Sequence, residues 1–261
     1  MTFTTETITV AGAELRVRRG GRGAPLLYLH GQDGLEEWPA FLDDLAQEFE
    51  VIVPDHPGFG GATSPQACPE WMDDISDLAY LYLDMLAALG LTGVRVVAHS
   101  LGGLIALEMA VRDNSRIKEL ALIASAGIHV KGCAKADIFM IDPDEQARLS
   151  YADPTLADAA AERALASKYQ DVAITNRIAS ARFGWSPRFY NPRLGRWLHR
   201  IQRPTLIVWG AQDQIFPPAH GPALQALLPG STLTRLPACG HLPHVEKKAE
   251  TLAALRSFFG R

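Results

Sequence analysis

Ser100 is the residue of this sequence best placed to act as a nucleophile. An apolar run from Gly93 to Ala98 comes just before it, and an apolar, helix-compatible segment over 103–111 follows. A serine between a strand and a helix matches the G-x-S-x-G pattern, here with Ala98 in place of the first glycine and Gly102 as the second. Small residues at these two positions keep a sharp turn free of collisions. The pattern therefore predicts a serine hydroxyl held clear of a sheet.

A serine needs a base at neutral pH, and the base needs a group that orients it. Asp213 follows a buried strand expected over 205–209, and His241 lies in the loop after a strand expected over 232–236. Carboxyl ends of strands in an open α/β sheet gather catalytic groups at one edge. We therefore expect Asp213 to hold the imidazole of His241, and His241 to take the proton of Ser100.

Each of these two roles has an alternative. An aspartate after a strand often serves as a turn or helix-cap residue, but the loop after the preceding strand, at 125–127, holds no carboxylate. His244 is the rival base, three residues after His241. His244 follows a proline and leads into a helix, whereas Gly240 gives the loop of His241 more freedom. Asp213 and His241 are therefore favoured.

An oxyanion hole requires main-chain N–H donors beside the nucleophile. Leu101 opens a helix whose first amides lack partners inside the helix, so its N–H is the first candidate. The second candidate is the N–H of Gln32, in the glycine-containing loop 30–34. A turn shaped only by strand geometry is the alternative for this loop. We also expect Gly31 and His99 to contribute to the substrate site.

Strands and helices are expected to alternate up to residue 126 and again from 201, which predicts an α/β fold with a parallel sheet. One amphipathic helix is expected over 70–89, ending at a glycine. Residues 127–200 hold helical patches and few strand-like runs, so this segment is expected to be an inserted helical cap. The core domain is then 1–126 with 201–261. Phe139 and Trp185 of the cap are candidate substrate-pocket residues, with simple packing as the alternative.

Five motifs follow one another along the chain: His30-Gly31, Asp55-His56-Pro57-Gly58-Phe59-Gly60, the turn around Ser100, Trp209-Gly210-Ala211-Gln212-Asp213 and Gly240-His241. In this order they resemble the α/β-hydrolase fold superfamily, in its branch of small cofactorless serine hydrolases with a helical cap. The resemblance implies an eight-stranded, mostly parallel sheet flanked by helices. It also implies that Ser100 forms an acyl-enzyme, which a water activated by His241 then hydrolyses.

The reaction follows less directly from the resemblance. Relatives that open epoxides or remove halogens use an aspartate as nucleophile, and dienelactone-type relatives use cysteine, so Ser100 favours hydrolysis of esters, lactones or thioesters. The alternative is hydrolytic carbon–carbon cleavage of ring-fission (meta-cleavage) products, for which Arg182 is a candidate carboxylate anchor. Those enzymes usually carry a Gly-Pro-rich loop after His-Gly and a tryptophan after the catalytic histidine, where this chain has Gln32-Asp33 and Leu242. A hydrolase-like ligand receptor is an alternative from another class.

Composition sets further limits on the function. The 261 residues carry a formal net charge of −4, which disfavours nucleic acid as a partner. The sequence contains no run of 18 apolar residues, so no membrane span is expected. The first residues show no secretion signal, so we expect a cytoplasmic protein. The 3 cysteines are far apart, and the histidines lack ligand spacing, so no metal and no cofactor are expected. The expected partner is a small ester-like substrate, and a homo-oligomer is left open.

Overall fold

The computed structural model describes residues 3–35, 37–60 and 68–260, without the side chains of 167–169. In this part of the chain, 8 strands form a sheet in the order β1-β2-β4-β3-β5-β6-β7-β8. β1 pairs with β2, and β2 with β4, in antiparallel fashion, and the other neighbours are parallel. The expected eight-stranded, mostly parallel sheet is confirmed. The strands are β1 (Phe3–Val10), β2 (Ala13–Gly20), β3 (Ala24–Leu29), β4 (Phe49–Pro54), β5 (Val94–His99), β6 (Ile117–Ile123), β7 (Thr205–Gly210) and β8 (Thr232–Leu236).

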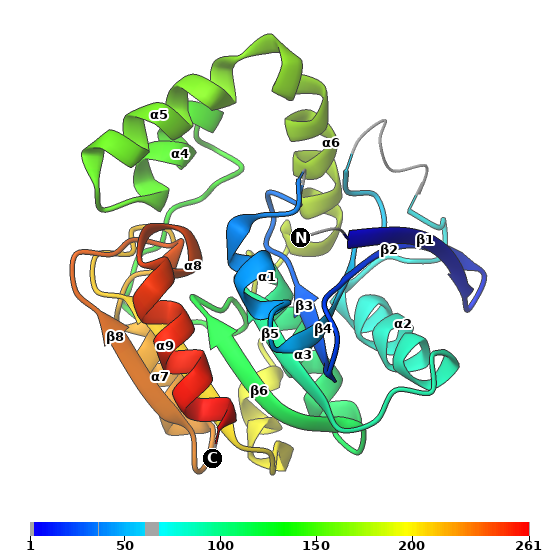
Figure 1. Cartoon of the computed structure of the whole chain (residues 1–261). Helices are drawn as coiled ribbons and strands as arrows, with labels where there is room; N and C mark the ends of the chain where they lie inside the picture. The colour runs from blue at the N-terminus through cyan, green and yellow to red at the C-terminus, as the bar shows by residue number, and fades with distance from the viewer. Residues whose placement is uncertain (1–2, 36, 61–67, 261) are drawn as a thin grey trace.

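Helices cover both faces of this sheet (Figure 1). α1 (Ala40–Leu45) and α9 (Lys248–Phe259) pack on one face, in a core that includes Val97. α2 (Ile75–Ala88), α3 (Leu101–Arg112) and α7 (His220–Leu227) pack on the other, in a core that includes Val96. All six residues of β5 are buried, because side chains on both faces of this central strand meet helices.

α2 begins later than the sequence pattern predicts. The apolar periodicity suggests a start near residue 70, but the helix starts at Ile75. The side chain of Asp74 accepts the N–H groups of Ser76 and Asp77, and the Asp77 side chain accepts the N–H of Asp74 in return. This reciprocal cap satisfies amides that have no partner within the helix, and so sets where the helix begins.

Three helices lie between β6 and β7: α4 (Pro143–Ser150), α5 (Pro154–Leu165) and α6 (Ser167–Gly184). We call residues 143–184 the α4–α6 segment. Figure 1 shows it on one side of the sheet, and hydrogen bonds described below join it to the loops that follow β3 and β8. The short 3-10 turns η2 (Leu194–Arg196) and η3 (Leu198–Arg200) then lead to β7. Within the described residues, no helix has the length and apolar character needed to cross a bilayer.

Candidate active site

Ser100 stands alone between β5 and α3. Its φ of 51° and ψ of −114° place a non-glycine residue in a strained region of backbone space. Main-chain hydrogen bonds on both sides hold this conformation: its N–H donates to Ile123 O at 3.0 Å, and its carbonyl accepts from Ala126 at 3.0 Å and Gly103 at 2.9 Å. The hydroxyl is thereby fixed at the end of the central strand.

The glycines after Ser100 allow α3 to pack directly against the sheet. A Cβ at Gly102 would lie 2.2 Å from the carbonyl oxygen of Leu29. A Cβ at Gly103 would lie 2.1 Å from Oγ of Ser125. The small residue expected at position 102 is therefore required by the end of β3, and the second glycine by the loop after β6.

The structure brings the three residues of the expected triad together. Nε2 of His241 lies 3.0 Å from Oγ of Ser100, and Nδ1 of His241 lies 2.9 Å from Oδ2 of Asp213. The Ser100 and His241 residues are fully buried, and Asp213 is 2% exposed. Because a carboxylate only accepts, Nδ1 carries the imidazole proton and Nε2 is left as an acceptor facing the hydroxyl. This is the arrangement that general-base catalysis requires.

Asp213 is held by its own loop. Its Oδ1 accepts the main-chain N–H groups of Ile215 and Phe216, both at 2.9 Å, which leaves Oδ2 for His241. The loops of Asp213 and His241 also approach closely, since a Cβ at Gly210 would lie 2.0 Å from the carbonyl oxygen of Gly240. Asp213 therefore caps its own turn through Oδ1 and at the same time contacts His241 through Oδ2.

His244 lies elsewhere. Its ring packs against Tyr28, Phe41 and His99, with centroids 6.4, 5.5 and 4.5 Å away. Burial, and secondarily the neighbouring His241, lower the pKa of His244 to about 3, so this ring is neutral. The structure thus gives His241, and not His244, the contact with Ser100.

His99, expected to bind substrate, is buried beneath the base. Its Nε2–H donates to the main-chain carbonyl of His241 at 3.0 Å. Burial, followed by the neighbouring His244 and His241, holds the pKa of His99 well below its ordinary value. A Cβ at Gly31 would lie 2.7 Å from Nδ1 of His99, so Gly31 lets the loop after β3 rest on this ring. Both residues act here as supports for their neighbours.

The two residues expected to supply the oxyanion donors, Leu101 and Gln32, lie next to Ser100. Leu101 is the first residue of α3, where a main-chain N–H lacks a helical acceptor. The loop of Gln32 is anchored by α6, because Ser180 Oγ donates to the carbonyl of Gln32 at 2.9 Å and Asn176 Nδ2 donates to that of Asp33 at 2.6 Å. The loop therefore has a fixed position beside the nucleophile.

The side chain of Gln32 also contacts the nucleophile, which the sequence did not predict. Oγ of Ser100 donates to Oε1 of Gln32 at 2.7 Å, a shorter contact than the 3.0 Å to His241. A serine hydroxyl has one proton. Before His241 takes that proton, the hydroxyl must turn away from Gln32.

Two further histidines position the loop after β3. The N–H of His56 donates to Nε2 of His30 at 3.1 Å, which leaves Nδ1–H of His30 to donate to Gly31 O at 2.8 Å. Nε2–H of His56 donates to the carbonyl of His30 at 3.0 Å, and its Nδ1 accepts from Tyr82 at 2.5 Å. Burial lowers the pKa of His30 to about 3, which fits these neutral tautomers. The network gives the His-Gly and Asp-His motifs of the sequence a structural role.

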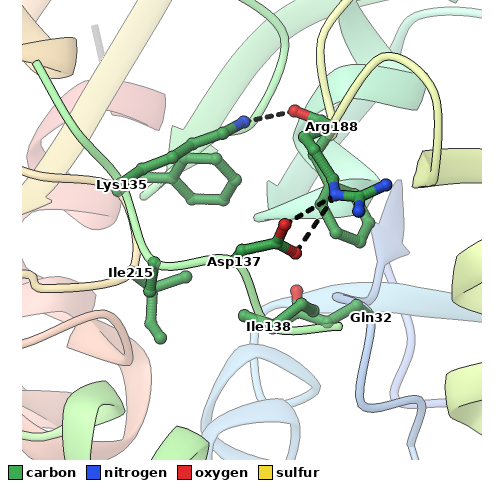
Figure 2. Close-up of a pocket in the computed structure, with 9 residues that line it drawn as sticks. Gln32, Lys135, Asp137, Ile138, Arg188 and Ile215 are labelled. Atoms are coloured by element: carbon green, nitrogen blue, oxygen red, sulfur yellow. Dashed lines mark hydrogen bonds and ion pairs between the residues drawn. The ribbon is translucent and has the colours of Figure 1, made fainter. Parts of the chain in front are cut away.

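A pocket opens beside these residues (Figure 2). Its cavity volume of about 10 Å³ has room for about one water molecule. The ring of Phe216, which lines it, lies 5.4 Å from the ring of His241. The lining residues are Gln32, Lys135, Ala136, Asp137, Ile138, Arg188, Phe189, Ile215 and Phe216. Apart from Gln32, sequence reasoning missed this set, since no motif marks it.

Phe139, Trp185 and Arg182, chosen from the sequence as candidate substrate-binding residues, are not among the residues that line this pocket. The ring of Phe139 stacks on Phe189 at 5.2 Å, and Trp185 stacks under the guanidinium of Arg188 at 3.8 Å. Arg182 donates to the main-chain carbonyls of Pro69, Glu70 and Met72 and lies 3.4 Å from Asp73. Its guanidinium fastens the segment before α2 to α6, so the structure does not bring the expected carboxylate anchor to the pocket.

Glu246 in α8 (Pro243–Glu246) joins the α4–α6 segment to the loop of His241. Its Oε2 accepts the N–H of Gly240 at 2.5 Å, and its Oε1 accepts those of Ala152 at 2.8 Å and Asp153 at 2.6 Å. The N–H of His241 itself donates to Ser150 O at 2.8 Å. The loop of His241 is therefore held both by Glu246 in α8 and by Ser150 in the α4–α6 segment.

We expect Glu246→Gln to lower kcat by about 10- to 100-fold, because small displacements of a catalytic group have effects of this size. The amide nitrogen would face the N–H of Gly240, so two donors would meet where an acceptor is needed. Steady-state kinetics with an ester measures the change in kcat, and thermal unfolding measures any change in stability. The matched control is Glu250→Gln on the exposed side of α9, which should behave as wild type. A lower unfolding temperature with unchanged kcat would limit Glu246 to a structural role.

Within the described residues, no group of 3 or more His, Cys, Asp or Glu side chains has the arrangement to hold a metal ion.

Comparison with known proteins extends over nearly the whole chain. The sequence profile of the alpha/beta hydrolase fold matches residues 24–248. The dihydrolipoyllysine-residue acetyltransferase component of an acetoin cleaving system from Cupriavidus necator is 28% identical, over 96% of this chain and 68% of that protein. The 2-hydroxymuconate semialdehyde hydrolase of a Pseudomonas species is 28% identical, over 96% of this chain and 92% of that protein. The structure of the esterase RhEst1 from a Rhodococcus species superposes with a TM-score of 0.78 at 23% identity, covering 100% of this chain and 99% of that one.

Proposed function

The chain belongs to the alpha/beta hydrolase fold family, and from that premise we propose that it is a serine hydrolase of small, partly apolar carboxylic esters or lactones. The observation that carries the proposal is the buried series of contacts from Ser100 through His241 to Asp213, at 3.0 and 2.9 Å. Such a series activates a hydroxyl without help from a cofactor. Lipases and a 2-hydroxymuconate semialdehyde hydrolase among the sequence relatives agree with hydrolysis as the reaction type.

The proposed reaction has two halves. In the first, His241 takes the proton of Ser100 while Oγ attacks the ester carbonyl, and the main-chain N–H groups of Gln32 and Leu101 bind the resulting oxyanion. His241 then gives its proton to the departing alcohol, which leaves an acyl-enzyme. In the second half, His241 takes a proton from water, the hydroxide attacks the acyl group, and the acid leaves as Ser100 regains its proton. Asp213 stabilises the imidazolium in both halves.

Residues 127–200, which include the α4–α6 segment, are the proposed cap over this site. The hydrogen bonds of α6 to the loop of Gln32 support this assignment, as does the bond between Ser150 and His241. The pocket beneath is nearly filled by its own side chains. Substrate entry therefore requires some of these side chains to move, and small substrates fit this requirement best.

Carbon–carbon hydrolysis of ring-fission products is the second candidate. It is favoured by the 28% identity to the 2-hydroxymuconate semialdehyde hydrolase over 96% of this chain. Two features weigh against it. Leu242 follows the histidine in place of tryptophan, and Arg182 is occupied by main-chain carbonyls before α2.

A substrate panel tests the choice between these reactions. Purified protein is assayed with short-chain 4-nitrophenyl esters, aliphatic lactones and a 2-hydroxy-6-oxo-dienoate, with fluorophosphonate-treated protein as the control. We expect repeated turnover of the esters and a higher kcat/KM for an ester or lactone than for the dienoate. A higher kcat/KM for the dienoate would favour the second candidate. Tight binding without repeated turnover of any compound would instead indicate a ligand receptor.

A further inference from the structure

The pocket beside the nucleophile carries three charged side chains in its lining: Lys135, Asp137 and Arg188. Two of them neutralise each other, because Nε of Arg188 donates to both carboxylate oxygens of Asp137, at 3.1 and 3.0 Å. Figure 2 shows this ion pair and Lys135 among the residues that line the cavity. The lining is therefore left with one net positive charge, on Lys135.

Lys135 is a half-buried cation among aromatic rings. Its Nζ lies 5.0 Å from the ring centroid of Phe216 and 5.5 Å from that of Tyr190, and it donates to the main-chain carbonyl of Arg188. Among the described residues, the structure gives its ammonium no carboxylate within salt-bridge distance. An ammonium has three N–H donors, and the carbonyl of Arg188 takes one of them. Two donors thus remain for a ligand in the pocket.

Burial of this ammonium has an energetic cost. It lowers the pKa of Lys135 to about 8, against the opposing effect of the Asp137 carboxylate. The aromatic rings repay part of this cost, since they attract a cation to their faces. An anion bound beside Nζ would stabilise the charged ammonium and so oppose the effect of burial on its pKa.

Two residues that line the pocket also contact the proposed catalytic residues. Gln32 lines it and accepts the hydroxyl of Ser100 at 2.7 Å. Phe216, on whose ring Lys135 rests, also lies against the ring of His241, with centroids 5.4 Å apart. A group bound at Lys135 would therefore belong to the molecule that reacts at Ser100.

We propose that Lys135 binds a carboxylate of the substrate, so that the esters hydrolysed at this site are carboxyl-bearing ones such as the half-esters of dicarboxylic acids. This inference rests on the proposed ester hydrolysis. Ile138, Ile215 and Phe189 supply apolar surface for the part of the substrate between its carboxylate and its ester.

Two matched pairs of esters test the proposal, because the carboxylate belongs either to the acyl group or to the alcohol. The first pair is 4-nitrophenyl hydrogen glutarate and its methyl ester. The second is 4-acetoxybenzoate and its methyl ester. We expect wild-type kcat/KM to be about 10- to 100-fold higher for the anion in one of the pairs, the range of a hydrogen bond to a charged group.

Variants of Lys135 test whether the preference for the anionic ester comes from this side chain. Lys135→Met keeps the length of the side chain and removes its charge, and it should reduce the anion-to-neutral ratio to near one, chiefly through KM. Lys135→Arg keeps the charge and should retain most of the anion-to-neutral ratio. Comparing the two variants therefore separates the loss of the charge from a loss of folding. Lys131→Met, at an exposed lysine on the same loop, is the matched control and should keep the wild-type ratio.

The pH dependence gives a second readout. The charged groups that act on Lys135 are Asp137, which raises its pKa, and Arg188, which lowers it. The titratable His220 and Tyr190 also lie near its ammonium, and in these surroundings the pKa of Lys135 is about 8. The ammonium is charged below that pH and neutral above it. The anion-to-neutral ratio should therefore fall as the pH rises through about 8. Taking the ratio cancels any pH effect that is common to both esters.

Equal kcat/KM within both pairs would overturn the proposal, as would a ratio that Lys135→Met leaves intact. If no ester is turned over, calorimetric titration with monomethyl glutarate and dimethyl glutarate replaces the kinetics. A preference for the anion that Lys135→Met removes would then keep the carboxylate site while the proposed hydrolysis fails. Equal binding would overturn both.

Discussion

We expect Ser100→Ala to lower kcat for 4-nitrophenyl esters by about 10⁶-fold, the loss seen when a nucleophilic serine is removed from a working triad. The Ser100 hydroxyl lies 3.0 Å from Nε2 of His241, and its loss removes the atom that forms the acyl-enzyme. Fold should be retained, because alanine at this position needs no extra space and the main-chain bonds to Ile123 and Ala126 do not involve the side chain. Ester kinetics and fluorophosphonate labelling, followed by intact-mass spectrometry, measure the effect.

Ser125→Ala is the matched control for this variant. Ser125 is also a buried serine in a loop after a central strand, but its hydroxyl donates to the carbonyl of Ala126 at 2.7 Å. Its variant should keep both turnover and labelling. Labelling of the Ser100→Ala protein at another serine would remove Ser100 from the proposed role.

Asp213→Asn should lower kcat by about 10⁴-fold while the protein stays folded. The asparagine oxygen can still accept the N–H groups of Ile215 and Phe216, which now bind Oδ1 of the aspartate. Its amide nitrogen then faces Nδ1 of His241, where only an acceptor fits. The imidazole proton must move to Nε2, so the ring donates toward Ser100 and no longer acts as a base. Thermal unfolding and ester kinetics separate the two effects.

The same substitution at Asp113 is the control. Oδ1 of this exposed aspartate accepts the N–H of Ser115 at 2.8 Å, so Asp113→Asn repeats the local exchange far from the histidine. Wild-type kinetics are expected for it. A loss of less than about tenfold in the Asp213→Asn variant, with the fold intact, would mean that another group orients His241.

The sequence predicts the candidate triad well for a physical reason. Each of its residues follows a buried strand closely, and parallel strands bring their carboxyl ends to one edge. Local patterns therefore suffice to place Ser100, Asp213 and His241 near one another. The predicted start of α2 is five residues too early, because the apolar periodicity extends to the N-terminal side of Asp74, which caps the helix.

The pocket could not be predicted in this way. Its lining comes from four separate parts of the chain: Gln32, residues 135–138, residues 188–189 and residues 215–216. Their meeting depends on how residues 127–200, which include two of these four parts, pack on the sheet, and no local pattern encodes this packing. The resemblance to carbon–carbon hydrolases suggests Arg182 as a carboxylate anchor, and no sequence pattern marks Lys135, which lies in a loop without periodicity.

The double attachment of the His241 loop bears on attempts to change specificity by recombination. Glu246 holds Gly240 together with Ala152 and Asp153, and Ser150 accepts the N–H of His241. A chimera that takes residues 127–200 from a homologue would replace half of these partners and so displace His241 along with any change in specificity. Crossover points should therefore keep residues 150–153 and 240–246 from the same parent.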